Sequence, residues 1–216
     1  MAERPVFVPE TTGSLLVQEV PIRFPWHPGL APSQKKRNVA ELHQAALAKG
    51  LTPLLEISSK SDLEVGQKLS AFHLKIDVEG RTTTVECAYQ GSKVFENGGP
   101  YVDLYWKDSR EAKRDLRTRE SGKLIKFQFE GADYPITPAT VFYDWLYFKA
   151  LYPHREWLRQ REEWAGFTDI EFNPERSINC QARSFAAFIS LQRRNLLDEA
   201  ISSFYSFRSF IARVAV

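Results

Sequence analysis

Cysteine is scarce in this chain of 216 residues, which contains two, Cys87 and Cys180. Two widely separated cysteines imply no disulfide framework and fit a reducing compartment. The chain also lacks an apolar run of membrane-spanning length, and its N-terminal Met-Ala-Glu-Arg-Pro has none of the apolar character of a secretory signal. We therefore expect a soluble cytoplasmic protein.

Neither sign of charge dominates. There are 29 basic and 27 acidic residues, and a net charge of +2 is too small to predict nucleic-acid binding from bulk electrostatics, although a local basic patch remains possible. An apolar content of 43% is enough to bury a core. No repeat, low-complexity linker or composition break divides the chain, so we expect a single domain over residues 1–216.

The motifs of common metal and cofactor sites are missing as well. The histidines His27, His43, His73 and His154 are scattered, and none has a metal-ligand spacing to a Cys, Asp or Glu. There is no glycine-rich dinucleotide or phosphate loop and no nucleophile elbow. We expect neither a metal nor a cofactor. Cys87 follows a glutamate, which raises a thiol's pKa, so we expect it to be buried and inert.

Hydrophobic periodicity and turn residues predict an α+β fold that is predominantly helical with a small antiparallel sheet. Extended segments are expected at residues 5–9, 15–24, 54–57, 72–78, 82–85 and 124–129, with a turn at 131–133 and a loop at 166–178. Helices are expected at residues 33–49, 86–93, 108–117, 137–151, 179–194 and 197–214. Asp108 is expected to cap its helix, and Pro138 to occupy the first position of the helix that it opens.

The segment around Glu86, Gln90 and Lys93 is the most informative. Spacings of four and three residues place the carboxylate, the amide and the amine on one helical stripe, and Gly98-Gly99-Pro100 is expected to end the helix. An acid, a hydrogen-bonding group and a potential nucleophile fit an active-site layout, but an ordinary solvated helix face has the same pattern. Seven residues give about 10 Å of rise, so Glu86 and Lys93 are expected to flank one sugar rather than touch one atom.

Each of these residues has a structural alternative. Thr83-x-x-Glu86 matches a capping box, in which the glutamate serves only the backbone at the helix start. Lys93 taken alone is typical of a solvated surface cation. It becomes a candidate nucleophile only when burial lowers the pKa of its amine.

Two loops are candidates for lining a ligand-binding site. Residues 97–103 offer glycine amides beside an Asn and an Asp, which suit sugar hydroxyls or phosphate, but a helix end followed by a turn explains the glycines equally well. Residues 168–181 bring polar side chains to a helix start, where a phosphate could bind or where Ser177 or Asn179 merely caps. Trp26, Trp106 and Trp145 are candidates either for stacking on a base or for core packing.

Several strings resemble the NADAR superfamily, namely residues 69–72, 85–93 and 168–171, with Trp145 and Asn179. Longer strings at residues 55–61, 91–101, 142–146 and 167–183 resemble the NADAR antitoxins paired with DarT-type toxins. The likeness runs from the first strand to about Arg194. Two departures stand out: Ala71 replaces the usual Asn, and the Trp-Gly pair before the last helix is absent.

The resemblance implies a YbiA/NADAR-like fold, with residues 1–60 as a family-specific extension. It also implies an N-glycosidase that removes ADP-ribose from guanine in DNA, RNA or nucleotide, as the antitoxin to a DarT-type ADP-ribosyltransferase, with no membrane partner. Lys93 would form a Schiff base with the opened ribose, and Glu86 would act as general acid/base. The implied substrate-binding residues are Ser59, Ser70, Phe72, Gln90, Asn97, Asp103, Trp145, Asp169, Asn179 and Arg183.

Two alternatives of other classes remain. One is a non-catalytic module that binds ADP-ribose or modified nucleic acid in the same cleft. The other is an antitoxin that contacts its toxin directly, for which the aromatic residues 204–211 offer a surface unless they pack in the core.

Overall fold

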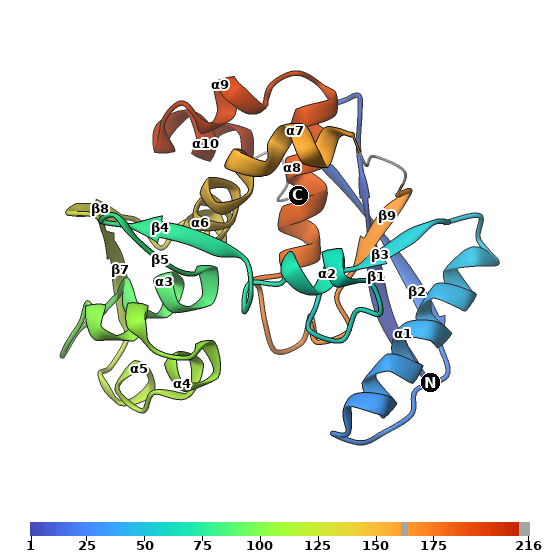
Figure 1. Ribbon diagram of the computed structural model, residues 1–216, viewed down its shortest axis with the longest axis horizontal. Coiled ribbons are helices and arrows are strands. Elements are labelled where there is room, and N and C mark those ends of the chain that lie inside the picture. Colours follow the sequence, from blue (N-terminus) through green and yellow to red (C-terminus); the bar gives the residue numbers. More distant parts are fainter. Residues whose placement is uncertain (161–163, 212–216) are drawn as a thin grey trace. The chain divides into compact units, whose positions relative to one another are not determined.

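The computed structural model describes residues 1–160 and 164–211 and confirms an α+β fold (Figure 1). The chain divides into two compact units. Unit 1 comprises residues 1–70 and 153–216, and unit 2 comprises residues 71–152. The single domain with an extension at residues 1–60 stays a prediction. Within the described residues, no helix combines the length and the apolarity that crossing a membrane would require.

Unit 1 is built on a sheet with the strand order β2-β1-β9-β3. The strands β1 (Ala2–Pro9) and β2 (Val17–Phe24) are antiparallel over their full length. The short strands β3 (Leu54–Glu56) and β9 (Gly166–Thr168) pair in parallel. Three residues of the loop predicted at 166–178 therefore form a strand. The sequence gives little sign of it, because a parallel pairing depends on a partner more than a hundred residues away.

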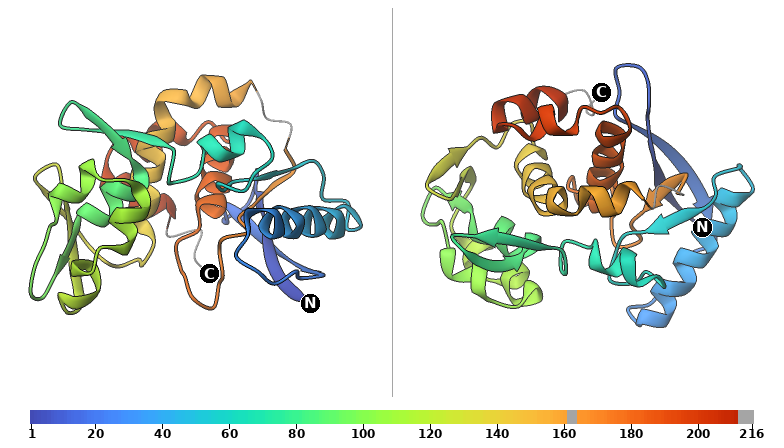
Figure 2. Two further views of the ribbon diagram at one scale, coloured as in Figure 1. Left: turned by 60° about the horizontal axis from the view of Figure 1, so that its bottom comes forward. Right: turned by 45° about the horizontal axis from the view of Figure 1, so that its top comes forward.

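Helices lie on both sides of this sheet (Figures 1 and 2). The helices of unit 1 are α1 (Pro32–Leu47), α2 (Glu64–Lys68), α7 (Arg155–Arg159), α8 (Gln181–Arg193), α9 (Leu197–Ile201) and α10 (Phe204–Ile211). On one side, Val6 belongs to a buried cluster with Leu42 of α1. On the other, the Phe167 ring meets Phe185 of α8 edge-on at 4.7 Å between centroids. The sheet thus forms the middle layer of the unit.

Unit 2 combines a hairpin, short helices and a second sheet. Its strands are β4 (Lys75–Val78), β5 (Arg81–Thr84), β6 (Lys93–Phe95), β7 (Leu124–Phe129) and β8 (Ala132–Tyr134). Its helices are α3 (Val85–Gly91), the 3-10 helix η1 (Val102–Trp106), α4 (Ser109–Arg114), α5 (Arg117–Glu120) and α6 (Val141–Leu151), and the 3-10 turn η2 (Tyr152–His154) follows α6 along the chain. β4 pairs with β5, and β6-β7-β8 form an antiparallel sheet.

An aromatic cluster forms the core of unit 2. The Phe127 and Phe142 rings stack at 4.4 Å between centroids, and Tyr89 lies 5.4 Å from Phe127. Such pairs add about 0.5–1.5 kcal/mol each beyond the burial of their area. The register places Lys93 opposite Phe127, so the strand that carries Lys93 lies on this core.

The helix predicted at 86–93 is shorter than expected. It ends at Gly91, and Lys93 is the first residue of β6. Pairing with β7 overrides the helical pattern, because the backbone of Lys93 joins the sheet. The prediction that Gly98-Gly99-Pro100 stops this helix is wrong. Those residues follow β6, where the Phe95 amide donates to the Gly98 carbonyl at 2.7 Å in a tight turn.

Other helix boundaries also differ. The helix expected from Pro138 begins at Val141, since the Val141 amide first donates to the Pro138 carbonyl in a turn. The helix expected over residues 197–214 is two helices, α9 and α10. Ser203 separates them because its hydroxyl accepts from the Ser206 amide, as a helix cap does. The remainder of that prediction, residues 212–214, lies outside the described residues.

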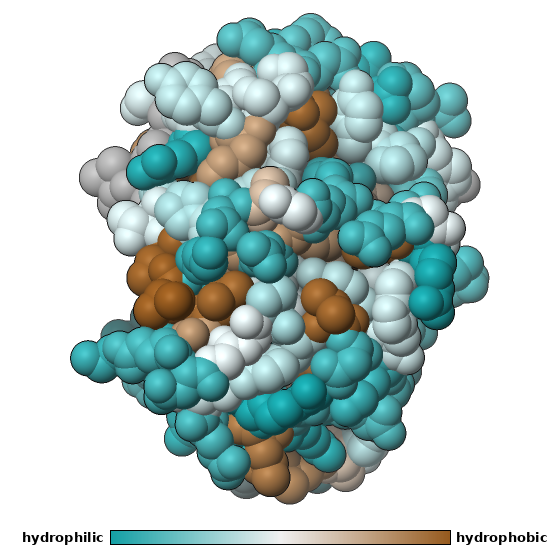
Figure 3. Space-filling model, turned by 90° about the vertical axis from the view of Figure 1, so that its left-hand side faces the viewer, coloured by the Kyte–Doolittle hydropathy of each residue, from teal (hydrophilic) through white to brown (hydrophobic). Residues whose placement is uncertain are grey.

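Large apolar side chains are not all enclosed. Figure 3 shows hydrophilic side chains over much of one side of the molecule, with smaller groups of apolar side chains among them. In the aromatic segment of α10, Phe207 and Phe210 are buried, whereas Tyr205 is 85% exposed. Core packing therefore accounts for two of the four aromatic side chains in residues 204–211.

Candidate active site

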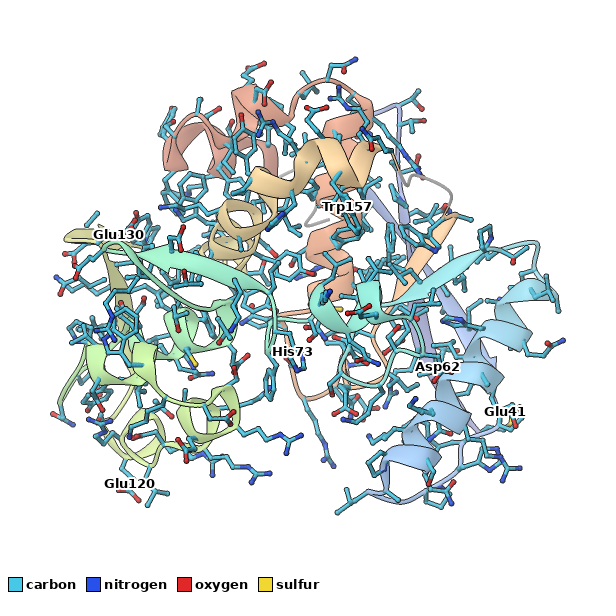
Figure 4. The ribbon with its side chains drawn as sticks, viewed as in Figure 1. Glu41, Asp62, His73, Glu120, Glu130 and Trp157 are labelled. Carbon is cyan, nitrogen blue, oxygen red and sulfur yellow. The ribbon has the colours of Figure 1, made fainter. Side chains whose placement is uncertain are left out.

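Glu86 is a buried carboxylate rather than a capping residue. The cap of α3 is Thr84, whose hydroxyl accepts from the Cys87 amide at 3.2 Å. The Thr83 hydroxyl instead donates to the Tyr105 carbonyl, so the capping-box interpretation is wrong. The Glu86 residue is 5% exposed. Glu120 and Glu130, labelled in Figure 4, are exposed, which shows how different the surroundings of Glu86 are.

The side chains of Glu86, Gln90 and Lys93 form one hydrogen-bonded chain. The Lys93 Nζ donates to the Gln90 Oε1 at 2.7 Å, and the Gln90 Nε2 donates to the Glu86 Oε1 at 2.9 Å. The three groups therefore come together as expected, although Lys93 reaches the chain from a strand. Gln90 lies between the acid and the amine, so Glu86 is linked to Lys93 through a neutral amide.

Burial makes the amine of Lys93 a weak base. The pKa of Lys93 falls from its ordinary 10.5 to about 8, chiefly because desolvation penalises the ammonium. The Glu86 carboxylate opposes this fall, and the Lys113 ammonium adds to it. At pH 7 roughly a tenth of the amine is then neutral, against less than a thousandth for an ordinary lysine. Lys93 therefore meets the condition for a nucleophilic amine.

Lys113 and Phe72 complete the surroundings of Glu86. The Lys113 Nζ lies 4.0 Å from the Glu86 Oε1 and 5.1 Å from the centre of the Phe72 ring. Phe72 was predicted as a substrate-binding residue, but Lys113 was missed. The sequence marks residues 108–117 only as a highly charged helix, and which of its cations faces Glu86 depends on the packing of α4 on α3.

The other predicted residues of unit 2 have different settings. Asn97 is exposed in the turn after β6. Asp103 is 51% exposed on its side chain, and both of its oxygens accept from Arg117, at 2.7 and 3.1 Å. Trp145 is 7% exposed in α6. Their roles as substrate-binding residues stay predictions.

The remaining predicted residues belong to unit 1. The Ser59 hydroxyl accepts from the Lys60 ammonium at 2.7 Å, and the Ser70 hydroxyl donates to a backbone carbonyl. Arg183 donates to the Ile178 carbonyl at 2.9 Å. Asp169 is buried, and its carboxyl oxygen accepts from the Glu171 amide at 3.0 Å.

Asn179 lies just before α8. The residue at the cap of this helix is Cys180, without a side-chain hydrogen bond, so the prediction that Ser177 or Asn179 caps it is wrong. The Ser177 hydroxyl donates to the Asn179 carbonyl instead, at 3.1 Å. Substrate binding by Asn179 and by the other unit 1 residues stays a prediction.

A second polar cluster in unit 1 centres on Glu56, which the sequence analysis did not select. Glu56 is 2% exposed and accepts from the Ser58 hydroxyl at 2.6 Å, the Thr168 hydroxyl at 2.6 Å and the Ile170 amide at 2.9 Å. Because the Thr168 hydroxyl donates to Glu56, it accepts from the His43 Nε2 at 2.8 Å. The cluster thus joins β3, β9 and α1.

The ionisable groups of this cluster have strongly perturbed surroundings. Burial lowers the pKa of His43 to about 4, so the imidazole is neutral at neutral pH. Burial raises the pKa of Glu56, and burial followed by the Glu56 charge raises that of Asp169. Through the hydrogen bonds that it accepts, Glu56 holds the segments that carry Ser59 and Asp169 in place. Only its place in a short apolar strand could have marked it.

Comparison with known proteins agrees with the resemblance seen in the sequence. A search of curated proteins finds no match. The family model described as the DarT1-associated NADAR antitoxin matches residues 2–216, which is nearly the whole chain. Because this match spans both units, the chain belongs to the family of DarT1-associated NADAR antitoxins.

Proposed function

We propose that this antitoxin is an N-glycosidase that removes ADP-ribose from guanine bases in nucleic acid and so reverses the modification made by a DarT-type toxin. Lys93 is the proposed nucleophile, and Glu86 is the proposed general acid/base. The observation that carries the proposal is the buried chain Glu86–Gln90–Lys93, in which desolvation holds the amine pKa at about 8. A buried lysine costs folding free energy, and such groups gather at functional sites.

The chemistry suits these groups. The neutral Lys93 amine attacks C1 of the ribose, and the bond from C1 to the guanine nitrogen breaks as the Glu86 carboxylate takes a proton from the attacking nitrogen and passes it to the leaving guanine. Loss of a proton from the attached nitrogen and opening of the ribose ring give the Schiff base. Water then adds to the imine with Glu86 as the base, and ADP-ribose leaves as the amine is restored.

Gln90 removes an electrostatic difficulty from this mechanism. A carboxylate in direct contact with Lys93 would stabilise the ammonium and suppress the attack. The hydrogen bonds through the Gln90 amide link the two groups without direct contact. Glu86 still raises the amine pKa, but desolvation has the larger effect.

The test is the mass of an ADP-ribosylated, guanine-containing oligonucleotide under single-turnover conditions. We expect the wild-type protein to remove ADP-ribose and Lys93→Ala to lose turnover by at least about a hundredfold, as variants of nucleophiles do. Lys93→Arg is the matched control, because it keeps the positive charge without a neutral amine. ADP-ribose binding should remain measurable in both variants.

Other outcomes would contradict the proposal. Unchanged turnover in Lys93→Ala would exclude the covalent route. Binding of the oligonucleotide without any change in its mass would favour the non-catalytic module. Neutralisation of the toxin by Lys93→Ala within a stoichiometric complex would favour direct toxin contact.

A further inference from the structure

The packing of α4 on α3 is tightly specified. Ala112 is fully buried in a cluster with Cys87 and Leu104. The Ser109 hydroxyl donates to the Phe72 carbonyl at 3.1 Å, which fixes the start of the helix. Because Ala112 and Cys87 belong to one buried cluster, the residues next to them in sequence, Lys113 and Glu86, become neighbours in space.

The resulting contact joins an exposed cation to a buried anion. The side chain of Lys113 is 57% exposed and that of Glu86 is 7% exposed, with 4.0 Å between Nζ and Oε1. The Lys113 ammonium also lies 5.1 Å from the centre of the Phe72 ring. A pair with one exposed partner contributes little to folding, about 0–1 kcal/mol. Stability alone therefore gives a weak reason for this arrangement, whereas the proposed chemistry gives a direct one.

We propose that Lys113 is a positioning residue for the reaction, which holds the Glu86 carboxylate in place beside the Gln90–Lys93 pair. This inference rests on the proposed function. Lys113 acts through Glu86 and Lys93, and it needs no contact with the reacting atoms.

The charges around Lys93 agree with this role. Glu86 from α3 raises the pKa of the amine, and Lys113 from α4 lowers it, in addition to the larger effect of burial. Lys126 of the neighbouring strand β7 and Asp133 of β8 pair with each other at 2.7 Å, so their opposite charges largely cancel at Lys93. Lys113 is thus the cation that opposes the effect of Glu86 on Lys93.

The pH dependence of deribosylation tests this role. We expect Lys113→Met to raise the midpoint of the kcat/KM profile by roughly half a unit, which lowers the rate at pH 7 about threefold. Lys113→Arg should restore the wild-type profile, since it keeps the charge. Arg114→Met is the control, because Arg114 is the next exposed cation on the same helix and its loss should leave the profile unchanged.

A second readout does not depend on turnover. The pKa of the Lys93 amine can be measured by NMR titration of the protein carrying isotope-labelled lysine, with Lys93→Ala to assign the signal. We expect the same upward shift in Lys113→Met. An unchanged Lys93 pKa together with an unchanged profile would overturn the role of Lys113, even if the wild type is active. If the wild type has no deribosylating activity but the Lys93 pKa still rises in Lys113→Met, the electrostatic coupling is supported and only the proposed function is contradicted.

Discussion

At the residue scale, the decisive feature is an amine that the fold keeps out of water. The Lys93 side chain has one neutral hydrogen-bond acceptor, Gln90, and its ammonium lies 4.7 Å from the centre of the Tyr89 ring. The sequence pattern predicts that the side chains of Glu86, Gln90 and Lys93 lie together, and their hydrogen bonds confirm it. The pattern cannot give the burial of the amine, because the core that desolvates it comes from residues far along the chain.

The first prediction concerns pH. Since the amine must be neutral to attack, kcat/KM should rise with pH and level off above about 8, the folded pKa of Lys93. Glu86→Gln should move the midpoint to lower pH, because it removes the carboxylate that raises this pKa. Steady-state rates between pH 6 and 10 test both statements. A midpoint near 10.5 would show that Lys93 is not desolvated.

The second prediction concerns the stability cost of the same lysine. The folded pKa of about 8 lies below the unfolded 10.5, so the unfolded chain binds the proton more tightly between these values. The penalty is complete below pH 8 and disappears as pH rises to 10.5. Lys93→Met should therefore raise the free energy of unfolding at pH 7 by about 1–2 kcal/mol.

Urea unfolding at pH 7 and at pH 10 measures this effect. The gain should shrink at the higher pH, since the wild-type amine is then neutral in the folded state. Lys123→Met is a suitable control, because Lys123 is exposed and its replacement should change stability equally at the two pH values. A loss of stability in Lys93→Met at pH 7 would contradict the account.

At the element scale, the site depends on how β6 is held. Gly99 has φ 89°, and a Cβ added there would lie 2.3 Å from the Lys93 carbonyl oxygen. From the sequence pattern, this glycine is predicted to end a helix or to line a ligand-binding site. Its close approach to the backbone of Lys93 follows from the turn after β6, which local patterns do not reveal.

The third prediction uses two glycines with similar backbone conformations. Gly99 has φ 89° and Gly131 has φ 77°, but a Cβ at Gly131 would meet nothing within 4 Å. Gly131→Ala should cost about 1 kcal/mol for its conformation alone. Gly99→Ala should cost more, since the backbone of β6 must move, and it should also reduce turnover. Equal costs with unchanged turnover would show that Gly99 does not position Lys93.

The fourth prediction tests the polar cluster of unit 1. Thr168→Val removes the hydroxyl that donates to Glu56 and accepts from His43. It should lower the free energy of unfolding by about 1–3 kcal/mol, because the buried Glu56 and the partly buried His43 each lose a hydrogen bond. Thr82→Val, which removes an exposed hydroxyl bonded to Asp77, should cost much less. Equal losses of unfolding free energy in the two variants, measured by urea unfolding, would show that the cluster has no structural role.

At the scale of the whole molecule, the α+β class follows from periodicity and turn residues, and most strands and helices lie near their predicted places. Two of the exceptions share one cause, which is long-range contact. β9 exists because β3 pairs with it, and Lys93 leaves the helix because β7 pairs with it. Glu56 and Lys113 were missed for the same reason, since their neighbours come from other elements.

The fifth prediction follows from the near balance of charge. With a net charge of +2, the strand itself should contribute little to binding. The slope of log K against log salt for a modified oligonucleotide should therefore be shallower than about −2, which corresponds to fewer than three phosphate contacts. Fluorescence anisotropy at several salt concentrations measures it, with free ADP-ribose as competitor. A steep slope would show that the strand contributes strongly.

The most direct measurement is reductive trapping of the proposed Schiff base. The protein is mixed with ADP-ribosylated oligonucleotide in the presence of borohydride and then digested for peptide mass mapping. We predict a stable ADP-ribosyl adduct on the peptide containing Lys93, and none with Lys93→Arg. Full turnover by the wild type without any adduct would contradict the covalent mechanism.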